Sequence, residues 1–155
     1  MKDKIQLAKV PLEEAEQFWQ MQRTAFLELL ERYQDRETNP ACQTLERVRE
    51  KMTQADSFFY WIKWEEESVG GIRIVARANE SKQISLLFVR PEYRNRGIAQ
   101  QAIRLAEELY GGKDWVLGTH LQEKRNCHLY EKMGYRPTGE TREINGKMTL
   151  IYYKK

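Results

Sequence analysis

The residues with the clearest chemical potential lie between positions 94 and 99, where a short basic segment contains a glycine. Arg94 and Arg96 carry positive charge, Gly97 lets the backbone approach a ligand closely, and Ala99 keeps the following turn narrow. The first backbone N–H groups of a helix have no partner within the helix and lie at the positive end of its dipole. A helix that begins here forms a site for an anion, so we expect a phosphorylated ligand.

The elements around this segment place it between a strand and a helix. Residues 84–89 are almost wholly apolar, so we predict a central strand that is buried on both faces. Pro91 ends that strand, and apolar residues then recur at helical spacing: Ile98, Ala102, Leu105, Ala106 and Leu109. The chain contains no GxGxxG and no GxxxxGK(S/T) pattern, which disfavours a dinucleotide or a nucleoside triphosphate as the ligand.

The rest of the chain alternates between strand and helix patterns. Six further strands are predicted at residues 4–10, 57–64, 69–77, 115–119, 135–144 and 147–153. One long helix runs from residue 11 to 33 with a bend near Thr24, a second carries Leu45, Val48 and Met52, and a later one stops at Gly134. Gly70 and Gly71 indicate a bulge or a close approach of two backbones. Strands 84–89 and 115–119 flank a helix and should lie side by side and parallel, which predicts an α/β fold with a mixed sheet of about seven strands and about four helices.

Composition and charge favour a globular protein and disfavour several classes of partner. The chain has 155 residues, 41% of them hydrophobic and 32% charged, so we expect residues 1–155 to form a single domain. Its net charge of +3 is too small to indicate nucleic acid as a partner. No segment has the apolar length of a signal peptide or a membrane span, so we expect a cytoplasmic protein that does not bind membranes.

Cysteine and histidine usage gives no sign of a disulfide or a metal. Cys42 and Cys127 are isolated and should be reduced thiols. His120, Cys127 and His128 lack the spacing of metal ligands, so no metal is expected. Whether the chain forms a homodimer is left open by the sequence.

Two segments resemble the acetyl-CoA-binding motifs of the Gcn5-related N-acetyltransferase (GNAT) family. Residues 87–99 resemble a strand ending Leu-x-Val-x-Pro followed by Gln/Arg-x-x-Gly-x-Gly/Ala, which Arg94, Gly97 and Ala99 match. Residues 126–135 resemble the downstream pattern Ala-x-x-Leu-Tyr-Glu-Lys-x-Gly-Phe/Tyr. The resemblance covers about the C-terminal half of the chain. It implies that the central parallel strands splay apart to admit acetyl-CoA, which donates an acetyl group to an amine.

The resemblance also implies roles for individual residues toward acetyl-CoA. Backbone groups of Leu87, Phe88 and Val89 would bind the pantetheine. The pyrophosphate would be wrapped by the basic turn and the start of the helix: Arg94, Asn95, Arg96, Gly97, Ile98 and Ala99. Asn126 would hydrogen-bond coenzyme A or cap a helix, although this chain departs from the family pattern at Glu123 and Asn126.

Catalytic groups follow from the chemistry of amine attack on a thioester. Tyr130 falls on the family's tyrosine, and a phenol is well matched to protonate a thiolate leaving group; the alternative is a packing role. The resemblance implies a glutamate base on the central strand, where this chain has Ser85, Leu86 and Leu87. His120, just past the neighbouring strand, is the candidate general base in its place, because an imidazole titrates near neutral pH. Asp35, Glu65, a water held by Ser85, or no base at all are the alternatives.

The acceptor site is the least determined part of the sequence. Tyr33 and Asp35 are candidate substrate contacts, because a ring face and a carboxylate attract an ammonium group; the alternative is a solvated loop. The leading hypothesis is an acetyl-CoA-dependent N-acetyltransferase that acts on a small-molecule amine. Acetylation of a protein lysine or N-terminus, and a non-catalytic acyl-CoA sensor, are the two alternatives.

Overall fold

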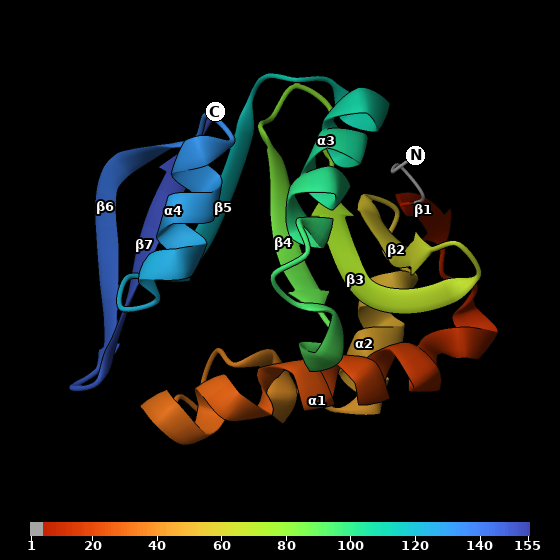
Figure 1. Ribbon diagram of the computed structural model, residues 1–155, viewed down its shortest axis with the longest axis horizontal. Helices are drawn as coiled ribbons and strands as arrows, with labels where there is room; N and C mark the ends of the chain where they lie inside the picture. The colour runs from red at the N-terminus through yellow and green to blue at the C-terminus, as the bar shows by residue number, and fades with distance from the viewer. Residues whose placement is uncertain (1–4) are drawn as a thin grey trace.

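A computed structural model describes residues 5–155 and contains a seven-stranded mixed sheet in the order β1-β2-β3-β4-β5-β7-β6 (Figure 1). The strands are β1 (Ile5–Lys9), β2 (Ser57–Trp64), β3 (Glu67–Val75), β4 (Lys82–Val89), β5 (Trp115–His120), β6 (Arg136–Asn145) and β7 (Met148–Lys154). The helices are α1 (Ala15–Tyr33), α2 (Leu45–Met52), α3 (Ile98–Tyr110) and α4 (Lys124–Lys132). The predicted α/β fold is confirmed. Lys4, where the first strand was expected to begin, lies outside the described residues.

The helices cover the two faces of the sheet in pairs. One apolar cluster packs α3 and α4 against the sheet through residues such as Ile103, Tyr130 and Ile72. The other cluster packs α1 and α2 on the opposite face, with Phe18 and Val48 against Phe59, Trp61 and Phe88. Alternate residues of a strand point to opposite faces, which is why β2 and β3 contribute to both clusters.

The parallel pair at the centre of the sheet separates soon after it begins. β4 and β5 are paired only at Lys82 with Trp115 and Gln83 with Val116, and Figure 1 shows the two strands diverging beyond this point. The expectation that they lie side by side is therefore correct only at their first residues. The splay implied by the family resemblance is confirmed.

Three local expectations meet different outcomes. The expected burial of β4 on both faces is confirmed in part, because the strand packs into both clusters, with Ile84 in the one under α3 and α4 and Phe88 in the one under α1 and α2, but these two are the only buried residues among 84–89. The predicted long helix is confirmed as a continuous α1 over Ala15–Tyr33, and the bend near Thr24 stays a prediction. The close approach at Gly70 is confirmed, because a Cβ there would lie 2.2 Å from the carbonyl oxygen of Phe88.

No helix within residues 5–155 is long and apolar enough to cross a membrane.

Candidate active site

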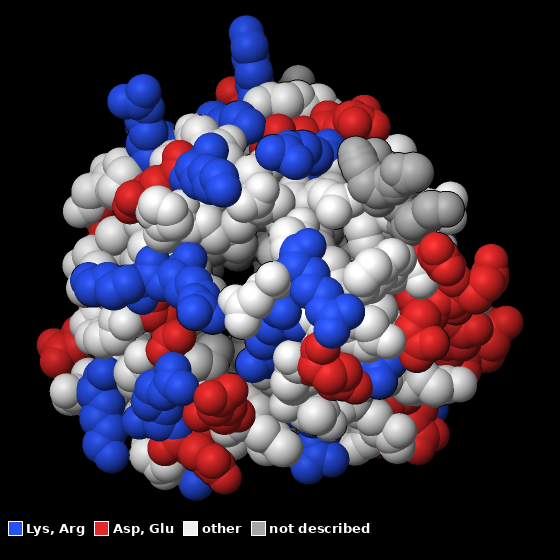
Figure 2. All heavy atoms as spheres, viewed as in Figure 1, with Lys and Arg blue, Asp and Glu red and all other residues white. Residues whose placement is uncertain are grey.

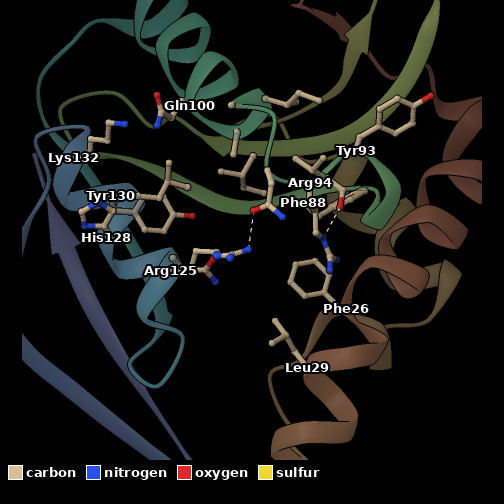
Figure 3. A pocket seen from close by; sticks show the side chains of 18 residues that line it. Phe26, Leu29, Phe88, Tyr93, Arg94, Gln100, Arg125, His128, Tyr130 and Lys132 are labelled. Atoms are coloured by element: carbon tan, nitrogen blue, oxygen red, sulfur yellow. Dashed lines mark hydrogen bonds between the residues drawn. The ribbon is translucent and has the colours of Figure 1, made fainter.

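The splay between β4 and β5 opens into a cavity of about 370 Å³, here called the first cavity (Figure 3). The end of β4, the start of α3 and the inner side of α4 form its walls, and Phe26 and Leu29 of α1 close its floor. Past Gln83 the edge of β4 that faces β5 has no strand partner in the described chain. Backbone groups of Leu87 and Phe88 therefore lie beside a cavity, as predicted for a bound chain-like ligand.

The N-terminus of α3 faces the first cavity with its backbone amides. Gly97 is the N-cap residue with a φ of 76°, and no side chain caps this end of the helix. Asn95 also adopts a positive φ, of 64°, so the turn depends on two left-handed residues in close succession. The cavity is lined by Asn95, Gly97, Ile98 and Ala99, which places the predicted anion site where unpaired N–H groups are available.

The two arginines of the basic turn have different surroundings. Arg94 lines the first cavity, but its guanidinium donates to the carbonyl oxygens of Ala25 at 2.8 Å and Val89 at 3.3 Å, which ties α1 to the end of β4. Arg96 lies over the rings of Trp64 and Tyr93, at 5.6 and 5.4 Å from their centroids. It does not line the first cavity, so its predicted side-chain contact with a phosphate is not supported by the structure.

The cation that reaches the turn comes instead from α4. Arg125 Nη1 donates to Asn95 Oδ1 at 2.7 Å across the mouth of the first cavity, and Lys132 lines the same cavity. Figure 2 shows Lys and Arg side chains on both sides of a central hollow, between the loop before α3 and α4. Sequence reasoning missed Arg125, whose only signal was a basic residue in the first turn of a helix.

Tyr130 projects from α4 into the first cavity, with its hydroxyl directed toward the open space (Figure 3). Its ring is buried and packs against Tyr135 and Tyr153, with centroids 6.1 and 6.2 Å away. Burial raises the pKa of Tyr130 to about 12, so the phenol keeps its proton at neutral pH. A protonated hydroxyl at a cavity wall is able to donate a hydrogen bond or a proton to a bound group.

A second cavity, of about 270 Å³, is also lined by this tyrosine. It is bounded by α1, the loop after α1, the middle of β4, the end of β5 and β7. The two cavities share Phe26, Leu29, Leu87, Asn126 and Tyr130. Asn126 is the third residue of α4, and Glu123 is the N-cap, so the helix-capping alternative for Asn126 is wrong.

His120 ends β5 and lines the second cavity. Its Nε2 atom is buried and has no hydrogen-bond partner in the described part of the chain. Burial lowers the pKa of His120 below its ordinary value of 6.5, although Glu123 and Asp35 act in the opposite direction. The imidazole is therefore neutral at pH 7 and has a nitrogen available to interact with a ligand.

Tyr33 stacks on His120, with ring centroids 5.5 Å apart. Its hydroxyl donates to Glu123 Oε2 at 2.5 Å, and Arg32 Nη1 donates to the same oxygen at 2.5 Å. Although burial raises the pKa of Glu123, these two hydrogen bonds lower it overall, so the carboxylate stays charged and paired. Tyr33 is buried and does not line the second cavity, so its position supports the orientation of His120 better than direct contact with a substrate.

Asp35 is placed by the structure inside the loop that follows α1. Its side chain is 1% exposed and accepts hydrogen bonds from the backbone N–H groups of Glu37 at 3.0 Å and Thr38 at 2.9 Å, and from the Thr38 hydroxyl. The structure therefore does not support the predicted contact between this carboxylate and an ammonium group, because both of its oxygens accept hydrogen bonds within the loop. Of the other suggested bases, Glu65 lines neither cavity, and Ser85 lines the second.

Comparison with known proteins agrees with the arrangement of these elements. Residues 15–135 match the acetyltransferase (GNAT) family. No curated protein sequence matches the chain. Solved structures with the same fold include an acetyltransferase from Thermus thermophilus, which is 19% identical with a TM-score of 0.71 over 97% of this chain and 96% of that chain.

Two further structures are of enzymes that act on different acceptors. Spermidine N-acetyltransferase from Vibrio cholerae, in complex with CoA and spermine, is 14% identical with a TM-score of 0.75 over 97% of this chain and 94% of that chain. An acetyltransferase from Salmonella typhimurium that modifies the N-terminal serine of ribosomal protein L7/L12 is 12% identical with a TM-score of 0.74 over 98% and 94%. Because the family match spans most of the chain and includes α3, β5 and α4, this protein belongs to the GNAT family of acetyltransferases.

Proposed function

We propose that the protein transfers the acetyl group of acetyl-CoA to the primary amine of a small-molecule acceptor. The observation that carries this proposal is the position of Tyr130 where the two cavities meet. A thioester at that junction would have its sulfur next to a phenol and its carbonyl carbon open to the second cavity. Structures with the same fold that contain acetyl-CoA or CoA support the choice of donor.

The first cavity fits the long, anionic donor. The diphosphate would accept hydrogen bonds from the first amides of α3, from residue 97 to residue 99, with Arg125 adding charge from the opposite wall. The pantetheine would lie along the unpaired edge of β4 and use backbone groups of residues 87–89. Arg94 donates to the carbonyl oxygens of both Val89 and Ala25, so the end of this edge is tied to α1.

The reaction would proceed by direct attack. The amine nitrogen forms a bond to the thioester carbon, and a backbone N–H near Val89 would stabilise the oxyanion that develops. His120 Nε2 would accept the proton that the amine loses. As the carbon–sulfur bond breaks, Tyr130 would give its hydroxyl proton to the thiolate and later regain one from water. Burial favours the neutral imidazole of His120 and the protonated phenol of Tyr130, which are the forms that a proton acceptor and a proton donor need.

Contacts between the β6–β7 hairpin and the end of α1 with the loop that follows it support a small molecule over a protein acceptor. Asn145 Nδ2, at the tip of the β6–β7 hairpin, donates to the Tyr33 carbonyl oxygen at 3.1 Å. Arg142 of β6 pairs with Glu37 of the loop after α1 at 3.1 Å. These contacts join the hairpin to the loop, whereas an extended peptide would need a groove between them.

The proposal is tested by following free thiol release from acetyl-CoA with a panel of small primary amines and of peptides with free N-termini or lysines. We expect release only when an amine is present and faster release with small amines than with peptides. Faster release with peptides would favour a protein acceptor. Binding of CoA without release for any amine would instead favour a sensor and would contradict the proposal.

A further inference from the structure

The second cavity, which the proposed function assigns to the acceptor, has a wall without ionic side chains. Among residues 5–155 its lining contains no Asp, Glu, Lys or Arg, and His120 is the only titratable group there apart from two tyrosines. The apolar part of the wall comes mainly from Phe26, Leu29, Pro40, Leu86 and Leu150. The polar part consists of uncharged groups that can hydrogen-bond, such as Gln83 and Ser85.

The carboxylates nearest to this cavity are engaged elsewhere. Glu123 accepts from Arg32 and Tyr33, and Asp35 accepts from three groups of its own loop. Both influence the pKa of His120, so they lie close behind the wall, but neither lines the cavity. A second ammonium group on a substrate would therefore find no carboxylate to contact.

A cation is buried behind the β4 side of the same wall. Arg73 is 9% exposed and donates to Ser57 at 2.8 Å, to Gln54 at 3.1 Å and to Ser85 at 2.9 Å. It forms no ion pair within residues 5–155, and its charge contributes, after burial, to lowering the pKa of Lys51 to about 8. Because Ser85 lines the cavity, a guanidinium lies one hydroxyl group away from the acceptor.

These features set a preference among amines. A monoamine that enters as the neutral free base brings no charge into the cavity, whereas a diamine or polyamine brings at least one ammonium into a space whose described lining offers it no carboxylate. Burying such a group without a partner is unfavourable, and a neighbouring guanidinium adds repulsion. An aromatic or aliphatic body would instead contact the leucine and phenylalanine side chains.

We propose that the acceptor, given the acetyl transfer proposed above, is a small primary monoamine with an uncharged and largely apolar body, and that polyamines are rejected. The preference distinguishes this chain from the spermidine N-acetyltransferase that shares its fold. It follows from the lining of one cavity and the placement of Arg73, and it does not depend on the identity of the donor.

The test compares 2-phenylethylamine with 1,5-diaminopentane, two primary amines of similar length that differ in whether the far end is a ring or a second ammonium. With the full-length protein and saturating acetyl-CoA at pH 8, kcat/KM from thiol release should be higher for 2-phenylethylamine by at least about tenfold, or about 1.4 kcal/mol. Equal values, or a higher value for the diamine, would overturn the inference and leave the acetyl transfer intact. No release with any amine would overturn the acetyl transfer instead.

A charge variant makes the test specific to the cavity wall. Leu150 of β7 lines the second cavity and is only half-buried, so Leu150→Glu should place a carboxylate at the wall, with Leu150→Gln as the uncharged control of the same size. Both variants lose the same apolar contact, so the effect of charge is the difference between them: the Glu variant should shift the ratio of kcat/KM toward the diamine by about tenfold more than the Gln variant does. Calorimetric titration of both amines into the CoA-bound wild type gives a second readout. Failure of 2-phenylethylamine to bind or react would overturn the inference.

Discussion

Replacement of Tyr130 by phenylalanine is the sharpest test of the proposed chemistry, because it removes one oxygen and leaves the packing in place. The ring contacts with Tyr135 and Tyr153 involve carbon atoms and persist in the variant. No hydrogen bond from the Tyr130 hydroxyl to another described residue is found, so the change leaves no partner unsatisfied. We therefore expect a change of less than about 1 kcal/mol in the free energy of unfolding.

The effect on turnover should be much larger than the effect on stability. General-acid catalysis typically contributes about 10²- to 10⁴-fold to a rate, so kcat for the phenylalanine variant should fall by at least about a hundredfold. The KM for acetyl-CoA should change by less than about threefold, since the diphosphate and pantetheine contacts lie elsewhere in the first cavity. Because the pKa of Tyr130 is about 12, deprotonation of this phenol should cause no loss of wild-type kcat between pH 7 and about pH 10.

The assay is thiol release under saturating acceptor, with acetyl-CoA varied, accompanied by thermal unfolding of both proteins. Tyr152→Phe is a suitable control, because Tyr152 lines the second cavity but not the first. A kcat within about threefold of the wild type would refute the acid role of Tyr130. A large rise in KM at unchanged kcat would show that the hydroxyl binds the donor and does not act in the chemical step.

Three further substitutions probe the base, the donor site and the loop. His120→Gln should lower kcat at pH 7.5 by about a hundredfold. In the wild type, protonation of His120 should reduce kcat below pH 6.5, and the variant should lack this loss. An unchanged pH profile of kcat in the variant would exclude the base role. Arg125→Gln should raise the calorimetric Kd for CoA by about tenfold with little change in kcat. Lys124→Gln changes a residue outside the first cavity and should leave this Kd unchanged. Equal effects of the two substitutions on Kd would contradict a specific diphosphate contact. Asp35→Asn should lower the free energy of unfolding, measured by chemical denaturation, by about 1–3 kcal/mol. Glu37→Gln should change it by less than about 0.5 kcal/mol. An unaltered denaturation midpoint for Asp35→Asn would contradict the role of Asp35 as a buried hydrogen-bond acceptor.

The parts of the site that sequence could predict are those that local backbone chemistry specifies. The turn at residues 94–99 was predictable because a preceding proline fixes φ and ends the strand, a glycine after a basic segment permits a left-handed conformation, and a helical apolar series shows where the helix begins. Gly97 does adopt a left-handed conformation at the start of α3. The order of strands and helices follows from the same short-range signals, whereas the splay of the central strands was implied only by the family resemblance.

Contacts between distant segments could not be predicted in this way. Arg125 meets Asn95 over 30 residues of sequence, and Tyr33 meets Glu123 over 90, and hydrophobic periodicity carries no information about such pairs. Charge alone was also misleading. Asp35 was expected to face an ammonium group but is used within its own loop, and Arg96 was expected to face a phosphate but lies over Trp64. Where a side chain points depends on its tertiary neighbours as well as on its type.

The central claim is that donor and acceptor cavities meet at Tyr130, and a crystal structure of the protein with bound CoA tests it most directly. The account predicts diphosphate oxygens hydrogen-bonded to backbone N–H groups at residues 97–99, and the thiol sulfur within about 3.5 Å of the Tyr130 hydroxyl oxygen. A sulfur atom that lies away from this hydroxyl, or a diphosphate bound outside the start of α3, would contradict it.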